Sequence, residues 1–439
     1  MFSRAFIAIV ISSAAPVLAQ TYQADVRAAQ ADFQSYAEVD RAYIRYLSTH
    51  TIPTDIPAEA VQAFWLPHLS AETILQRQIP QRVGDTKFFR IDLRDLGWTV
   101  DAWLKLGKEY PYAGGYENPL FVRVDWLIWI TSDTANSTLY YDLLYAETGA
   151  PKNREEFLER WRVDLKDADG FEQAIVIDEG SSGVALRTRL VVRRQTPAGY
   201  YWETFDSEIG EGENDPLEHL GGGLKYDAQE LIASIPKIDL VTGERGAAQA
   251  YLLTDGAGNR VEEASARIVV DSSDRIPLIR TPGSCIRCHS TGLLNLPRNL
   301  VRELVTDGVE IYSKDKQQAE AIERLYLGKL DKELTRNQED FAAFVASVCD
   351  LEPVAVTKAY ADVLGFYEAN VSLEQAAIEL AAVDADELRN AIAYYAEAQG
   401  QAAPRLAMLA HGKDIPRRIW EADVYDRAKA ALKLWRDRP

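Results

Sequence analysis

The chain carries a five-residue motif, Cys285-Ile286-Arg287-Cys288-His289, which contains two of its three cysteines. The spacing C-x-x-C-H is the one that covalent haem attachment requires. Two thiols at this spacing bond to the two vinyl groups of a porphyrin, and the imidazole that follows can bind the iron. The motif therefore predicts one covalent haem c, held by Cys285 and Cys288, with His289 as an axial iron ligand.

The N-terminal residues 1–19 have the features of a secretory signal peptide. Arg4 precedes the apolar run 5–10, and small residues lead to an expected cleavage site after Ala19. The apolar run is too short for a permanent membrane span, and no other segment is long enough, so we expect no integral membrane segment. Covalent haem attachment takes place on the outer side of bacterial plasma membranes. The signal peptide and the haem-attachment motif together predict a periplasmic protein, with an extracellular location as the alternative.

Three alternatives to haem attachment stay open for the cysteine pair. A disulfide between Cys285 and Cys288 suits an oxidising compartment, although it gives no reason for the adjacent His289. A zinc site would need Cys349 and a histidine, and no second C-x-x-C or H-x-x-x-H pair completes it. The third alternative is a chance occurrence of the pattern. Cys349 ends an apolar helical run, so we expect it to be a buried core residue.

The charge of the chain limits its partners. The formal net charge is −19, from 67 Asp and Glu against 48 Lys and Arg. An acidic protein of this kind is not expected to bind nucleic acid or anionic lipid. Its charge would suit a basic redox partner protein, and it also serves solubility. A hydrophobic content of 47% is ordinary for a globular protein.

The pattern along the chain predicts an α+β fold in three regions. We expect a mixed α/β N-terminal region at 20–163, a β-rich antiparallel module at 164–284, and a helical region at 285–439 that starts with the haem-attachment motif. The haem motif would then lie at the seam between two units, a common place for a cofactor cleft. Expected helices are 22–47, 99–110, 153–163, 314–327, 335–348, 355–366, 384–398 and 421–436, and expected strands are 87–94, 172–178, 184–194, 199–207 and a hairpin around 255–259.

The chain resembles c-type cytochromes through its attachment motif. Longer stretches resemble large, mostly uncharacterised bacterial periplasmic monohaem proteins, over roughly residues 85–300. The matching segments are FRIDLRDLGW, VRVDWLIWITS with YYDLLY, GYYWETFDS, and AYLLTDGAGNRVEEA leading to GSCIRCHSTGL. Such relatives carry a histidine in an H-D-G-G-E pattern before the hairpin. Here the corresponding residues are Tyr226-Asp227-Ala228-Gln229-Glu230, so the resemblance implies no histidine ligand at that position.

The sixth iron ligand is the open chemical question. Four side chains are the candidates: His219, beside a glycine run; Met408 and His411, in the helical tail; and Tyr226, at the position where the relatives carry histidine. Arg287, Arg280 and Arg298 could each pair with a haem propionate. Aromatic side chains that could line the pocket are Trp98, Trp103, Trp126, Trp129 and Trp202.

Two functions fit these features. The first is periplasmic electron transfer through the haem, which needs two strong axial ligands. The second is a haem enzyme or a protein that binds a small ligand of haem, such as peroxide, oxygen or another gas, at an open or weakly held sixth position. Electron transfer comes first because it is the commoner role of a monohaem c-type protein. The size of the chain and the scarcity of a convincing sixth ligand favour the second.

Overall fold

The computed structural model describes residues 15–75, 79–166, 172–179, 181–239, 243, 245–271, 277–293, 299–304, 313–328, 330–399 and 403–438. Helices and antiparallel strands both contribute to it, and the expected α+β class is confirmed. Residues 1–14 of the expected signal peptide lie outside the described residues, and the first helix begins at Ala15. Among the described helices, none is both long and apolar enough to cross a bilayer.

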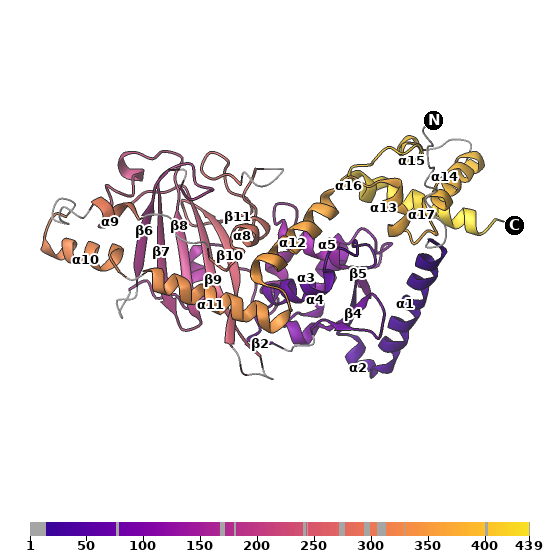
Figure 1. The fold of residues 1–439 in the computed structure, drawn as a ribbon, viewed down its shortest axis with the longest axis horizontal. Helices are drawn as coiled ribbons and strands as arrows, with labels where there is room; N and C mark the ends of the chain where they lie inside the picture. Colours follow the sequence, from indigo (N-terminus) through magenta and orange to yellow (C-terminus); the bar gives the residue numbers. More distant parts are fainter. Residues whose placement is uncertain are drawn as a thin grey trace, which may run out of the picture.

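The first part of the chain forms a four-stranded sheet with helices around it (Figure 1). The strand β1 (Ile44–Ser48) lies inside this sheet, antiparallel to β4 (Phe88–Asp92) and parallel to β5 (Phe121–Arg123), and β3 (Gln81–Arg82) lies at the edge. The helices of this part are α1 (Ala15–Ser35), α2 (Glu38–Arg41), α3 (Ala58–Trp65), η1 (Leu66–Leu69), η2 (Leu93–Leu96), α4 (Val100–Glu109), α5 (Val124–Ser132), α6 (Leu139–Leu144) and α7 (Arg154–Arg160).

The central part forms a larger sheet in the order β11-β10-β9-β8-β7-β6, with every one of these neighbours antiparallel. The expected hairpin is confirmed, since β10 pairs with β11 across the turn at 255–259. A short strand from the first part, β2 (Ile74–Leu75), joins the same sheet beside β9. The strands are β6 (Gln173–Ile177), β7 (Arg189–Thr196), β8 (Gly199–Phe205), β9 (Ala228–Asp239), β10 (Arg245–Asp255) and β11 (Arg260–Val261), and η3 (Gly212–Asn214) follows β8.

The last part of the chain is helical, as expected. The capping pairs expected from the sequence are present: Ser372 Oγ accepts the N–H of Gln375 at 3.2 Å, and Asp384 Oδ1 accepts that of Glu387 at 2.7 Å. The helices are α8 (Gly283–Cys288), α9 (Leu300–Leu304), α10 (Lys316–Tyr326), α11 (Leu330–Val348), α12 (Pro353–Glu368), α13 (Leu373–Glu379), α14 (Ala385–Gln399), α15 (Pro404–Ala410), α16 (Arg417–Ile419), η6 (Trp420–Val424) and α17 (Tyr425–Arg436).

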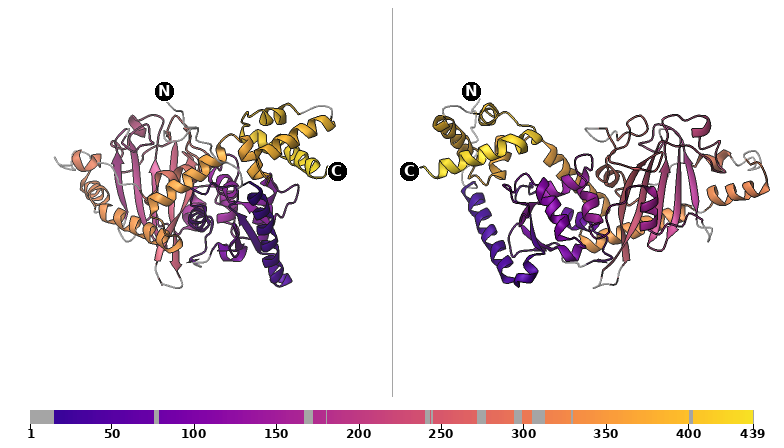
Figure 2. Two further views of the ribbon diagram at one scale, coloured as in Figure 1. Left: turned by 45° about the vertical axis from the view of Figure 1, so that its right-hand side comes forward. Right: turned by 180° about the vertical axis from the view of Figure 1, so that it is seen from behind.

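Helices cover both faces of the larger sheet (Figures 1 and 2). The long helix α11 crosses one face, where Trp202 Nε1 of β8 donates to Asn337 Oδ1 at 3.2 Å. The helix α7 covers the opposite face, where Arg154 pairs with Glu203 at 2.7 Å. Side chains alternate between the two faces along each strand, so neighbouring residues of β8 contact different helices.

The hydrophobic core does not follow the expected region boundaries at 163/164 and 284/285. One continuous cluster runs from the N-terminal helices through β7–β10 to α11 and α12. A separate cluster is built from helices at 371–432 and forms a helical unit at one end of the molecule, at the opposite end from α10 (Figure 1). The N-terminal and central parts therefore fold around one core.

The sequence prediction is wrong for one expected helix and omits the strand β9. The expected helix 22–47 ends earlier, and Ile44–Ser48 forms strand β1 because its side chains are buried between β4 and β5. The strand β9 is not expected from the sequence. Pro236 lies inside it, and proline is unusual within a strand because it has no N–H to donate. Of the β8–β9 pairs, only those of Ala233, Ile232 and Leu231 are formed, so Pro236 lies beyond the ladder with β8.

Candidate functional site

The attachment motif lies in the short helix α8. Cys285 and Cys288 are three residues apart, so both thiols lie on one side of the helix. His289 follows as the C-cap, and its N–H donates to the carbonyl of Cys285 at 2.7 Å. Gly283 brings α8 close to α5, because an added Cβ would lie 2.6 Å from the carbonyl oxygen of Ser132. Both thiols and the imidazole thus project from one helical turn.

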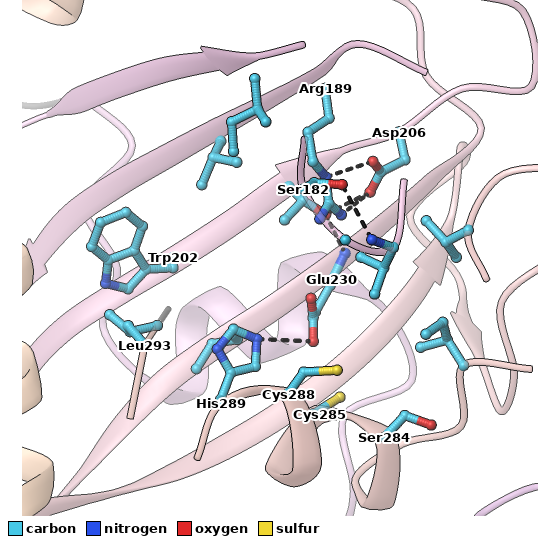
Figure 3. A pocket seen from close by; sticks show the side chains of 18 of the residues that line it. Ser182, Arg189, Trp202, Asp206, Glu230, Ser284, Cys285, Cys288, His289 and Leu293 are labelled. Carbon is cyan, nitrogen blue, oxygen red and sulfur yellow. Dashed lines mark hydrogen bonds and ion pairs between the residues drawn. The ribbon is translucent and has the colours of Figure 1, made fainter. Parts of the chain in front are cut away.

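These three side chains line a cavity of about 520 Å³. This volume is within the range of about 300–1,000 Å³ found for small-molecule and cofactor sites. The floor is the sheet face that α11 crosses, and α11 itself contributes Leu334. Most of the wall is apolar, with Ile177, Val191, Trp202, Ile232, Leu253 and Leu293 among its members. Figure 3 shows Cys285, Cys288 and His289 reaching towards Glu230 of β9.

A β-bulge determines which residues of β9 face the cavity. The carbonyl of Asp206 accepts the N–H groups of both Asp227 and Ala228, at 2.8 and 3.1 Å. Two residues of one strand therefore oppose one residue of the next, which reverses the side-chain alternation at this point. After the bulge, Ala228, Glu230 and Ile232 line the cavity. Before it, Tyr226 packs on the opposite face, with its ring 5.0 Å from that of Phe205.

Glu230 faces the motif directly. Its Oε1 lies 3.8 Å from Nε2 of His289. Burial favours a higher pKa for this carboxyl, but the neighbouring His289 and Arg189 outweigh burial and lower the pKa to about 2. The other ring nitrogen of His289, Nδ1, is buried without a hydrogen-bond partner among the described residues. The cavity therefore holds a carboxylate opposite the ring nitrogen that an iron atom would use.

A buried ion pair supports the same wall of the cavity. Arg189 Nε and Nη2 donate to the two carboxylate oxygens of Asp206 at 2.8 and 2.6 Å. Thr204 Oγ1 also donates to Asp206, at 2.8 Å, and accepts the N–H of Glu230 at 3.0 Å. This bidentate pair lets the two buried charged groups satisfy each other. It fixes the backbone from which Glu230 projects.

The two thiols of the motif are free, and their surroundings favour the protonated form. Cys285 and Cys288 do not form a disulfide with each other. Burial, with the nearby Glu230, raises the pKa of the Cys285 thiol well above its usual value. Burial, with Asp271 and Glu230, raises the pKa of Cys288 to about 12. Neither thiol is therefore activated as a nucleophile at neutral pH.

None of the four candidate sixth ligands lines the cavity. Tyr226 is on the far side of the sheet, as described above. His219 precedes Leu220, which packs in the cluster of β6, β7, α9 and α10 that also lies on that far side. Met408 and His411 belong to the helical unit built from 371–432, where both are exposed.

Of the tryptophans and arginines expected near the haem, some lie at the cavity and others do not. Trp202 lines the cavity, whereas Trp98, Trp103 and Trp126 belong to the core and Trp129 packs against it. Arg287 pairs with Asp271 at 3.0 Å and Arg280 with Asp133, so both have carboxylate partners. Arg298 lies outside the described residues.

Cys349 does not complete a zinc site. It follows the C-terminal end of α11, half-buried against the main core, and its thiol lies 3.9 Å from the carbonyl of Leu351. Over the described ranges, no group of three or more His, Cys, Asp or Glu side chains could hold a metal ion on its own. A haem needs no such group, since the porphyrin itself supplies four of the iron ligands.

The residues present fit the haem that the motif predicts. Two free thiols and an imidazole face one cavity of about 520 Å³, and the wall is mostly apolar. The sequence analysis missed Arg189, Asp206 and Glu230, because they meet only through the pairing of β7, β8 and β9. In comparisons with known proteins, no family model, no curated protein and no solved structure matches the chain.

Proposed function

We propose that the chain is an exported monohaem c-type protein. Cys285 and Cys288 would form the thioether bonds, and Nε2 of His289 would bind the iron. The observation that carries the proposal is that these three side chains project from one helical turn into one cavity of about 520 Å³. Haem supplies one-electron redox chemistry and an iron that binds small ligands.

Of the two functions, we place chemistry on a small haem ligand before simple electron transfer. An electron carrier needs a second strong axial ligand, and His219, Met408, His411 and Tyr226 are all absent from the cavity wall. The wall has instead a carboxylate and an arginine–aspartate pair next to the motif. The sixth position would then be open or weakly held, as suits a haem-dependent oxidoreductase or a gas-binding protein.

Covalent attachment is tested by haem staining after denaturing electrophoresis. The protein is produced with a haem-attachment system, together with Cys285→Ala, Cys288→Ala and the control Cys349→Ala. We expect strong staining in the wild type and in Cys349→Ala, and loss of stable staining in both motif variants. A wild type without staining, or motif variants that stain as strongly as the wild type, would overturn the proposal.

The visible spectrum of the reduced protein, with and without carbon monoxide, distinguishes electron transfer from chemistry on a small haem ligand. An open or weakly held position gives a carbon monoxide complex at once. A sharp six-coordinate low-spin spectrum that carbon monoxide leaves unchanged would instead identify an electron carrier. The periplasmic location is tested separately, by release of the haem-stained protein with the periplasmic fraction.

A further inference from the structure

Glu230, whose side chain is 16% exposed, differs from two buried carboxylates of the larger sheet, Glu203 and Asp206. Glu203, on the opposite face of the sheet, pairs with Arg154 at 2.7 Å and also with Arg194. Asp206 has the bidentate contact with Arg189. Among the described residues, Glu230 forms its ion pair with His289. Its position is therefore not explained by a structural ion pair with an arginine.

The separation between Glu230 and His289 has a chemical meaning. An imidazole nitrogen and a carboxylate oxygen each bind a first-row metal such as zinc at about 2 Å. Two such ligands on opposite sides of one metal are therefore about 4 Å apart. The observed distance between Nε2 of His289 and Oε1 of Glu230 is 3.8 Å. The observed distance is close to the one expected for two ligands of one metal atom.

We propose that Glu230 supplies the sixth ligand of the haem iron, as an exchangeable carboxylate opposite His289. This inference rests on the proposed function, because it assumes that haem c is attached at α8. The carboxylate projects from the regular part of β9, beyond the bulge, where Glu230 pairs with Leu253 of β10. Its backbone N–H is held by Thr204 at 3.0 Å. The ligand would therefore come from a rigid strand.

A carboxylate ligand determines which haem chemistry is favoured. Carboxylate is a hard, anionic ligand, so it stabilises ferric iron over ferrous iron and lowers the reduction potential. It leaves the iron more readily than histidine or methionine does, so a small ligand can replace it. A negative oxygen at this position also disfavours anionic ligands such as cyanide relative to neutral ones such as imidazole.

The test compares the haem-loaded wild type with Glu230→Gln, Glu230→His and the control Glu208→Gln. Glu208 is an exposed carboxylate, paired with Arg267 at 3.4 Å and outside the cavity. The readouts are the ferric visible and electron paramagnetic resonance spectra, the midpoint potential, and the affinity of ferric protein for imidazole. None of these depends on a catalytic activity.

We expect Glu230→Gln to change the ferric spectrum, raise the midpoint potential, and tighten imidazole binding by about tenfold, the effect of removing a competing ligand worth about 1.4 kcal/mol. Glu230→His should give a sharp low-spin spectrum with two histidine ligands. Glu208→Gln should match the wild type. If Glu230→Gln and Glu230→His both keep the wild-type spectrum and potential, Glu230 is not the sixth ligand.

The two proposals fail in different ways. A wild type that carries no covalent haem removes the proposed function, and with it the assignment of Glu230. Covalent haem in the wild type, with unchanged spectra in both Glu230 variants, removes only the assignment of Glu230.

Discussion

The indole of Trp202 donates a hydrogen bond to Asn337 at 3.2 Å, and both side chains are buried. This contact joins β8 to α11 beside the cavity. We predict that Asn337→Leu lowers the free energy of unfolding by about 1–3 kcal/mol, because it leaves the indole N–H without an acceptor. Urea denaturation measures the change. In a Trp202→Phe background, Asn337→Leu should lower the free energy of unfolding by less, because the indole N–H is already absent. An equal loss of unfolding free energy in both backgrounds would contradict the prediction.

The axial role of His289 gives a second prediction. His289→Ala should keep the covalent haem, because both thiols remain, and should change the ferric and ferrous visible spectra. Added imidazole should restore much of the wild-type spectrum by binding in place of the lost side chain. His411→Ala is the matched control, since His411 is exposed at the end of α15. A His289→Ala spectrum identical to the wild type would exclude His289 as a ligand.

A third prediction concerns the attachment of the C-terminal helical unit. The side chain of Glu379, at the end of α13, is fully buried and contacts Arg123 and Arg417, each at 2.7 Å. Glu379→Gln would remove the carboxylate that neutralises two buried arginines. The free energy of unfolding should therefore fall by about 3–5 kcal/mol. Glu374→Gln, on the exposed side of the same helix, should cost less than about 0.5 kcal/mol. Equal denaturation midpoints for the two variants would refute this role for Glu379.

Lys237 predicts a specific dependence of stability on pH. Burial lowers the pKa of its ammonium from 10.5 to about 7, although Glu72 acts in the opposite direction. Between these values the unfolded chain binds the proton that the folded protein has released, so the contribution of Lys237 to stability rises with pH. From pH 7 to 9, the stability of the wild type relative to Lys237→Met should increase by about 1.4 kcal/mol per pH unit.

The control for this measurement is Lys316→Met, which changes an exposed lysine on α10. Its stability should follow that of the wild type at every pH. Parallel curves for the wild type and Lys237→Met would show that Lys237 keeps its proton when buried. Its Nζ would then remain an ammonium that donates to the carbonyls of Ser70 and Glu72, at 2.8 and 2.6 Å.

Local patterns predict the local structure well. The hairpin at 255–259 and the helix caps at Ser372 and Asp384 depend on residues a few positions apart, and all three are present. The strand β1 is missed because its conformation depends on distant partners. Its sequence continues a helical pattern, and only burial between β4 and β5 makes it a strand.

In the candidate site too, residues close in sequence are predicted and residues brought together by the fold are not. Cys285, Cys288 and His289 are adjacent in sequence, so one pattern identifies all three. The opposite side of the cavity could not be predicted, because it depends on the register of β7, β8 and β9 and on one bulge. That bulge separates Tyr226 from Glu230, although the two residues are close in sequence. The resemblance makes Tyr226 a candidate ligand by its position in the sequence, whereas the register brings Glu230 to the cavity.

The burial of Cys285 bears on how the protein would be assembled. Only 2% of this residue is exposed, and the wall above the motif includes Leu334 of α11, from a segment that follows the motif in the chain. Under the proposed function, an attachment enzyme must reach the thiols before α11 docks. Folding and haem attachment would therefore compete kinetically. A chain in which α11 docks before attachment would remain without its haem. Because α11 leaves the export channel after the motif, the order of export itself would favour the productive route.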